Sequence, residues 1–246
     1  MAYVIQWLRS LIFNILMYVA LVIIGIGFAP WALFSREGSY AAINSFCWWV
    51  VWSASWMVGL KTEIRGEIPD DGVLVAAKHQ SFFDILIIFG ALPRGKFIMK
   101  SSLVWAPVVG QYGLRIGCVP VDRGKRGAAI KKMVADVKSG AKEAGQLIIF
   151  SQGTRVAAGD KQPYKIGTGV LYRELKQDCV PVATNVGVFW PRHGVYRTPG
   201  VAVVEFLPRI KAGIKIAPFM AELEETVEAA SDSLMAEAGF VGKENK

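Results

Sequence analysis

Residues 73–91 read VLVAAKHQSFFDILIIFGA, and this stretch decides the fold. It begins with a short apolar run at 73–77, which is typical of a buried strand, and it ends with an apolar, helix-like segment at 82–91. The polar turn between the two segments contains His79. A strand followed by a turn and a helix is the repeating unit of α/β sheets, and functional side chains gather where such strands end.

The rest of the chain continues this alternation. Strand-like runs occur at 62–67, 96–99, 117–121, 146–150, 180–184 and 201–206, and helix-like segments at 128–144, 168–176 and 219–239. Because strands and helices alternate, we predict an α/β domain over residues 61–246, with helices on the faces of its sheet and an acidic amphipathic helix near its end.

The first 60 residues have a different character. Residues 11–34 carry no charge and are long enough for a membrane span, which needs roughly 20 residues. A signal peptide would have a shorter apolar region of about 7–15 residues. A second uncharged run at 39–60 contains four tryptophans, a residue that prefers the headgroup layer of a bilayer. We therefore predict a membrane-associated helical hairpin over residues 1–60, followed by the α/β domain.

The charges that flank the hairpin indicate its orientation. Arg9 lies on one side, and Lys61 and Arg65 on the other, whereas the turn carries Arg36 and Glu37, which cancel. By the positive-inside rule the α/β domain lies in the cytoplasm, at the cell inner membrane. We favour a hairpin that dips into one leaflet, with a full span and a hairpin simply packed on the body as alternatives.

The apolar residues and the excess positive charge are concentrated in different parts of the chain. The chain has 246 residues, of which 53% are hydrophobic, and a net charge of +8. Residues 1–60 contribute +1, residues 61–217 contribute +12 and residues 218–246 contribute −5, which sum to +8. Apolar character combined with positive charge suits a membrane surface better than nucleic acid, and we find no nucleic-acid-binding module. Three cysteines without a CxxC spacing argue against a disulfide framework or a structural zinc site.

The chemistry centres on His79 and Asp84, five residues apart. An Asp in the first turn of the helix can accept the imidazole Nδ1–H, fix the tautomer and stabilise the cation that forms when Nε2 takes a proton. The sequence offers no nucleophile beside this pair, so the attacking group is expected to be a hydroxyl of the substrate. A hydrogen-bonded structural histidine is the alternative.

Two arginines follow other predicted strands. Arg123 follows the run at 117–121, and Arg155 follows the run at 146–150. Arginine binds phosphate with a planar fork, Gly153 allows backbone N–H groups to approach an anion, and Thr154 adds a hydroxyl. Together with His79, these residues predict a cleft that holds a phosphate beside a general base.

Four short blocks of the sequence resemble those of a known family. Residues 78–84 (KHQSFFD) resemble the His-x4-Asp block of the bacterial 1-acylglycerol-3-phosphate acyltransferases. Residues 117–123 (GCVPVDR) resemble the second block of that family, 151–155 (SQGTR) the third and 180–182 (VPV) the fourth, in the family's order. One departure is that Ser151-Gln152 replaces the usual Pro-Glu, which keeps the length of the side chain but removes a negative charge beside an anionic substrate.

The resemblance implies a glycerolipid acyltransferase-like fold, a mixed sheet flanked by helices. It also implies acyl transfer from acyl-CoA or acyl-carrier protein to the sn-2 hydroxyl of lysophosphatidic acid, giving phosphatidic acid, with no cofactor and no metal. His79 and Asp84 would be catalytic, and Lys100, Arg123, Gln152, Gly153, Thr154 and Arg155 would bind substrate.

Two alternative functions remain open. One is a related membrane acyltransferase with another acceptor, such as glycerol-3-phosphate, a lyso-ornithine lipid or a glycolipid. The other is a non-catalytic, lipid-binding protein of the membrane surface.

Overall fold

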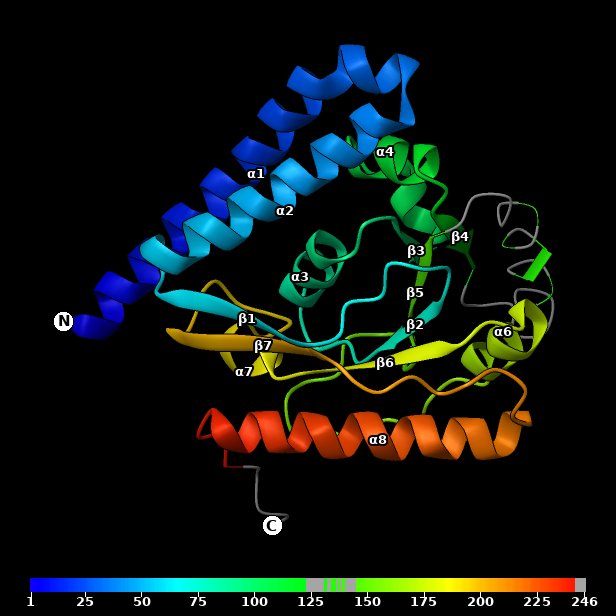
Figure 1. Cartoon of the computed structure of the whole chain (residues 1–246). Helices are drawn as coiled ribbons and strands as arrows, with labels where there is room; N and C mark the ends of the chain where they lie inside the picture. Colours follow the sequence, from blue (N-terminus) through cyan, green and yellow to red (C-terminus); the bar gives the residue numbers. More distant parts are fainter. Residues whose placement is uncertain (123–130, 132–133, 136, 138, 140–144, 242–246) are drawn as a thin grey trace.

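One sheet organises the chain (Figure 1). A computed structural model describes residues 1–122, 131, 134–135, 137, 139 and 145–241. The strands are β1 (Leu60–Gly66), β2 (Leu74–Ala77), β3 (Gly95–Lys100), β4 (Val119–Val121), β5 (Gln146–Phe150), β6 (Cys179–Thr184) and β7 (Gly200–Phe206). Their order is β1-β7-β6-β2-β5-β3-β4, and each neighbouring pair is parallel except β6 with β7. This confirms the predicted α/β fold with a mixed sheet.

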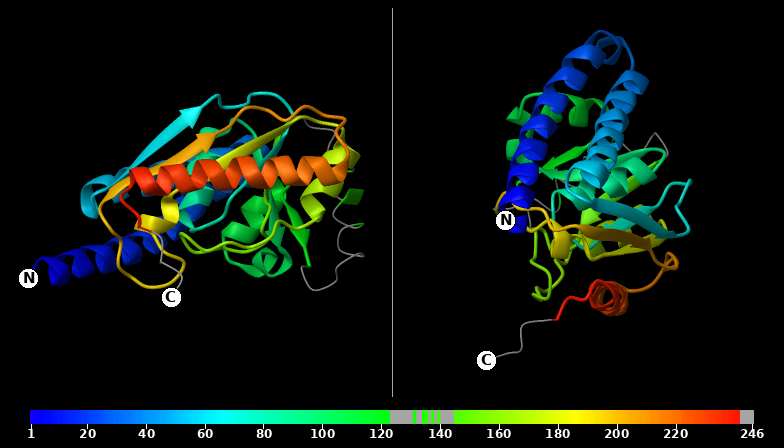
Figure 2. Two further views of the ribbon diagram at one scale, coloured as in Figure 1. Left: turned by 90° about the horizontal axis from the view of Figure 1, so that it is seen from below. Right: turned by 90° about the vertical axis from the view of Figure 1, so that its left-hand side faces the viewer.

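Helices cover both faces of the sheet. They are α1 (Ala2–Phe34), α2 (Arg36–Met57), α3 (Phe83–Ala91), α4 (Val109–Arg115), α6 (Gly167–Leu175), α7 (Val186–Phe189) and α8 (Ile216–Glu237), with a 3₁₀ helix η1 (Ser101–Trp105). In Figure 1, α8 runs below the sheet, whereas α3 lies above it, beneath α1 and α2. The right-hand view of Figure 2 shows α8 end-on, on the far side of the sheet from the hairpin.

The predicted strands and α/β-domain helices that fall within the described residues agree with the structure to within three residues at each end. The predicted helix at 128–144 lies largely outside the described residues. Our sequence analysis did not find η1, α4 or α7, because elements of four to seven residues are too short to show a hydrophobic period. The uncharged run at 11–34 is only part of α1, which begins at Ala2 and includes Gln6 and Arg9.

Alternating residues of the strands build two hydrophobic cores. Val75 and Ala77 of β2 face the core that the sheet shares with α2 and α3, whereas Leu74 and Ala76 face the core shared with α6 and α8. This is the two-residue period of a strand that is buried on both faces. All four residues are fully buried.

The hairpin is packed on the α/β part of the chain along one face of α2. Cys47, Val50 and Ala54 belong to the same core as the buried face of α3. Among the described residues, α1 is the one helix long and apolar enough to cross a membrane, with a mean hydropathy of 2.6 over a window that is 22% buried.

A polar stripe on α1 contacts a distant loop. Gln6, Ser10 and Asn14 are spaced four residues apart, so they lie on one face of the helix. Gln6 Nε2 donates to the backbone oxygen of Arg197 (2.8 Å), and the backbone N–H of Arg197 donates to Ser10 Oγ (3.0 Å). The Arg197 guanidinium donates to Asn14 Oδ1 (3.0 Å) and lies over the Trp190 ring. These contacts hold α1 against the segment between α7 and β7.

Candidate active site

The register of the sheet brings two loops together. β2 and β5 are parallel neighbours with Ala77 opposite Phe150, so the residues after both strands emerge at the same edge. His79 follows β2, and the segment 151–155 follows β5. The backbone N–H of Val156 donates to the His79 carbonyl oxygen (2.8 Å), which ties the two loops directly.

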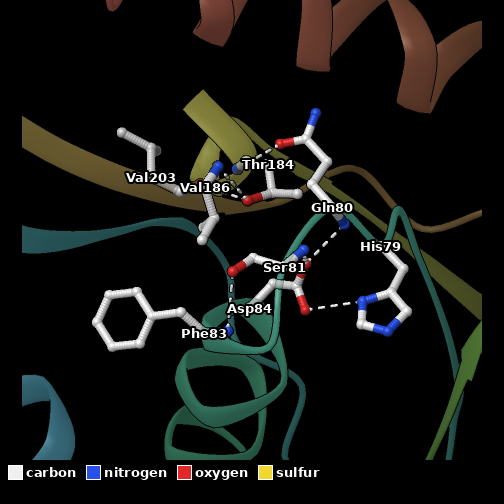
Figure 3. A network of polar contacts seen from close by, with 9 residues as sticks. His79, Gln80, Ser81, Phe83, Asp84, Thr184, Val186 and Val203 are labelled. Atoms are coloured by element: carbon white, nitrogen blue, oxygen red, sulfur yellow. Dashed lines mark hydrogen bonds and ion pairs between the residues drawn. The ribbon is translucent and has the colours of Figure 1, made fainter. Parts of the chain in front are cut away.

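His79 and Asp84 form a buried pair (Figure 3). His79 Nδ1 lies 2.9 Å from Asp84 Oδ1. The other carboxylate oxygen accepts the backbone N–H groups of Gln80 (2.7 Å) and Ser81 (2.8 Å). Both N–H groups belong to the loop that precedes α3, which begins at Phe83, so the loop itself fixes the aspartate. With its Nδ1–H donated to Asp84, His79 presents a lone pair at Nε2.

The imidazole is also fixed from its face. Its ring stacks on Phe150 with centroids 3.9 Å apart and an interplanar angle of 18°. His79 is 8% exposed and Asp84 is fully buried, and the cavity that His79 lines gives the pair a route to a substrate.

That cavity has a volume of about 470 Å³ and joins polar and apolar surroundings. Lys100 and Arg155 line it together with His79. The remainder of the lining is largely apolar and comes mainly from α1 to α4, η1 and β3, with Leu21, Ile43, Phe46, Leu86, Val109 and Tyr112 among its residues. A largely apolar cavity lined by a base and two cations suits an amphiphile with an anionic head.

The structure places three of the other predicted site residues apart from the cavity lining. Gln152 is fully buried, and its Nε2 donates to the Gln162 carbonyl oxygen (3.2 Å). Gly153 has a φ of +73°, which the tight turn after β5 requires and which glycine tolerates best. Gln152, Gly153 and Thr154 lie outside the lining of the cavity. Arg123 lies outside the described residues.

Several residues at the site escaped our sequence analysis. Phe150 stacks on the imidazole. It ends the apolar run that precedes the segment 151–155, so a predicted pairing of β2 with β5 would have placed it beside His79. The wall formed by η1 and α4 carries no comparable signal, because its segments are short and its partners lie on α1 and α2.

Cys118 also lines the cavity, but its environment suppresses its reactivity. Burial raises the pKa of this thiol to about 11, and Sγ accepts the backbone N–H of Phe97 (3.3 Å). The thiol is therefore neutral near pH 7 and a poor nucleophile. Within the residues that the structure describes, no group of three or more His, Cys, Asp or Glu side chains is placed to hold a metal ion.

Comparison with known proteins gives consistent matches. The family model described as Acyltransferase matches residues 60–185. A 1-acyl-sn-glycerol-3-phosphate acyltransferase from Pseudomonas aeruginosa is 25% identical over 197 residues, which are 79% of this chain and 77% of that protein. A protein of the same name from Cocos nucifera is 28% identical over 159 residues, and the match covers 63% of this chain and 52% of the plant protein.

The fold has a counterpart among solved structures. The 1-acyl-sn-glycerophosphate (LPA) acyltransferase from Thermotoga maritima superimposes with a TM-score of 0.79 and 21% identity, covering 96% of this chain and all of the other. The likeness extends through the helical hairpin as well as the sheet, because so little of the chain lies outside it.

Proposed function

We propose, from the premise that this chain belongs to the Acyltransferase family, that it transfers an acyl chain from a thioester to the sn-2 hydroxyl of 1-acylglycerol-3-phosphate, giving phosphatidic acid for phospholipid synthesis. The observation that carries the proposal is the shared cavity, in which His79, held by Asp84, and two cationic side chains meet a largely apolar lining. The similar proteins from Pseudomonas aeruginosa and Cocos nucifera support the proposal, because both are named as 1-acyl-sn-glycerol-3-phosphate acyltransferases.

The reaction needs one base and no covalent enzyme intermediate. His79 Nε2 takes the proton of the acceptor hydroxyl while that oxygen attacks the thioester carbonyl carbon. The tetrahedral intermediate then collapses, the C–S bond breaks, and the thiolate leaves and takes the proton from the imidazolium. Asp84 holds the ring in position and stabilises its charge during the interval, through the 2.9 Å contact with Nδ1.

The cationic residues are assigned to the acceptor's phosphate. Arg155 and Lys100 line the cavity with the base, so a phosphate bound to them would present the neighbouring glycerol hydroxyl to His79. Arg123, two residues after the end of β4 in the sequence, is proposed as a third contact. Gln152, Gly153 and Thr154 are proposed to act by shaping the turn that presents Arg155.

The apolar part of the cavity is assigned to an acyl chain. Its walls include residues of α1 and α2, so the same hairpin that would contact the bilayer also encloses the chain. We propose that the enzyme works at the cytoplasmic face of the cell inner membrane, with acyl-CoA or acyl-carrier protein as donor. No cofactor enters this scheme.

A thiol-release assay on detergent-purified protein tests the function. With lysophosphatidic acid and either thioester donor, the wild type is expected to release free thiol, and His79→Ala is expected to reduce turnover by about 100-fold or more. His193→Ala is the matched control, because His193 is the other histidine of the chain and is exposed. Absence of thiol release from the wild type with both donors would refute the proposal.

The phosphate assignment has its own test. Arg155→Ala is expected to raise the KM for lysophosphatidic acid by about 10-fold or more, because a charge-assisted contact is lost, with a smaller effect on the KM for the donor. Arg173→Ala, an exposed arginine of α6, is the control. An unchanged acceptor KM in Arg155→Ala would reject the assignment. Glycerol-3-phosphate and a lyso-ornithine lipid, run in parallel, distinguish the alternative acceptors.

A further inference from the structure

A buried ion pair lies directly beside the proposed base. Lys78 precedes His79 in the chain, yet its side chain is only 1% exposed. Its Nζ lies 2.5 Å from Oε2 of Glu228, whose side chain is 15% exposed. Glu228 is on α8, 150 residues further along the chain and on the face of the sheet opposite α3. The proposed reaction gives neither residue a task.

Glu228 also holds a second segment. Its Oε1 accepts the hydroxyl of Tyr164 (3.0 Å). Burial and the neighbouring carboxylate raise the pKa of Tyr164, which keeps its hydroxyl protonated and able to donate. Tyr164 ends the loop that begins after β5 and carries Arg155, and the next residue closes that loop on itself through Lys165 N–H to Ser151 O (2.7 Å). The Glu228 carboxylate therefore binds both active-site loops, through Lys78 at the start of the His79 loop and Tyr164 at the end of the Arg155 loop.

The helix that carries this carboxylate is firmly seated. Phe219, Leu223 and Val227 of α8 are fully buried in the core that the sheet shares with α6 and α8. Phe219 stacks on Tyr172 of α6 with ring centroids 3.8 Å apart. Further along α8, Ser231 Oγ accepts the backbone N–H of Thr184 at the end of β6 (3.3 Å). Glu228 is thus presented from a rigid support.

Stability is a poor explanation for such a pair. Removing two charges from water costs about as much as their attraction returns, so apolar residues of the same size often serve equally well for stability. What a buried pair supplies in addition is a defined geometry between the groups that it joins, since each charge must meet its partner. Here those groups are the two loops that present His79 and Arg155.

We propose that Glu228 is a positioning residue, which sets the place of His79 relative to Arg155 by holding Lys78 with one oxygen and Tyr164 with the other. The proposal rests on the proposed function. The direct tie from Val156 N–H to the His79 carbonyl keeps the loops in contact, and Glu228 fixes how they meet. A displacement of about 1 Å between a base and its substrate can cost a factor of roughly 100 in rate.

The decisive experiment separates position from stability. Glu228→Leu alone leaves the Lys78 charge buried without a partner and is expected to lower Tm by roughly 10 °C. The triple variant Lys78→Met/Tyr164→Phe/Glu228→Leu removes the whole polar group and is expected to regain a Tm near that of the wild type. Its kcat/KM in the thiol-release assay is nevertheless expected to stay at least about 10-fold below wild type. Glu225→Leu, at an exposed position of the same helix, is the control.

The triple variant overturns the proposal if it recovers both Tm and kcat/KM, since the pair would then be purely structural. If the triple variant does not fold, Tyr164→Phe decides, because it removes one hydrogen bond and leaves the ion pair in place. It is expected to raise the acceptor KM about 5-fold by loosening the Arg155 loop, and an unchanged KM would reject the proposal. Failure of the proposed function itself would be distinct, because the wild type would then release no thiol.

Discussion

Gln152 fills a position where a glutamate would be poorly placed in this chain. Its side chain is fully buried, and its amide nitrogen donates to the carbonyl oxygen of Gln162. A carboxylate at that point would face a carbonyl oxygen with no proton between them. Our sequence hypothesis was that the missing charge favours an anionic substrate, whereas the observed contact gives the amide a task within the loop that presents Arg155.

Gln152→Glu is expected to lower the free energy of unfolding by about 2 kcal/mol at pH 7, because a buried charge would lack a partner. The folded-state pKa of that carboxyl would be raised above its usual value of about 4.3, so the loss relative to wild type should shrink as the pH falls towards 5. Chemical denaturation at a series of pH values measures this, with the exposed Gln111→Glu as control. A loss independent of pH would contradict the explanation.

The site divides into contacts that a sequence reveals and contacts that it does not. His79 and Asp84 are five residues apart, across one turn, so local geometry alone predicted that they could meet. The pairing of Lys78 with Glu228 spans 150 residues and depends on which face of the sheet α8 covers. No local pattern reports that, because the sequence period gives the faces of each element but not which element covers them.

At the scale of elements, α1 and α4 approach closely at a glycine. A Cβ built on Gly25 would lie 2.6 Å from Cγ1 of Val108, which is closer than real contacts allow. The Tyr112 hydroxyl donates to the Gly25 carbonyl oxygen (2.5 Å). Val108 has a φ of +65°, an uncommon value for a β-branched residue. Gly25, Val108 and Tyr112 all line the cavity assigned to the acyl chain.

Gly25→Ala is therefore expected to narrow that cavity or to displace its wall. The ratio of kcat/KM for a long-chain donor to that for a short-chain donor should fall by about 10-fold, since the longer chain loses its place. Gly27→Ala on the same helix is the control, because a Cβ there meets no atom within 4 Å. The same chain-length preference in both variants would show that this contact does not limit the cavity.

The central strands were predictable because their burial is uniform. β2, β5 and β6 are short apolar runs buried along their whole length, and β5 was predicted with its observed ends, Gln146 and Phe150. The segment from Ser101 to Arg115 was not predicted, because its helices are short and several of its apolar side chains, such as Trp105 and Val109, are exposed. A hydrophobic period needs several turns that alternate between a buried and an exposed face, and these short helices offer at most two turns.

At the scale of the whole molecule, the hairpin is attached to the α/β part at several separate points. The polar stripe meets the Arg197 segment near one end of α1, and the Arg94 guanidinium binds Glu37 (2.6 Å) at the turn between α1 and α2. On the outside of α2, Trp48, Trp52 and Trp56 are exposed and their rings contact one another. We propose that this row of tryptophans lies in the membrane interface and thereby sets the height of the cavity relative to the lipid.

Replacing Trp48, Trp52 and Trp56 together with serine is expected to weaken binding to anionic phospholipid vesicles by about 10-fold or more, because three interfacial anchors are lost. Vesicle sedimentation measures this, and Ile166→Ser, at an exposed apolar residue at the start of α6, is the control. Activity in detergent should remain close to wild type. Equal vesicle binding by the triple variant and the control would place the membrane contact elsewhere.

The stripe of Gln6, Ser10 and Asn14 has a consequence for the order in which the chain is made. The Arg197 segment that pairs with these residues is synthesised more than 180 residues after them. β1 likewise waits for β7, its neighbour at the edge of the sheet. Until then the stripe lacks its partners in the Arg197 segment, so the final docking of α1 is expected to be a late closure over a long loop.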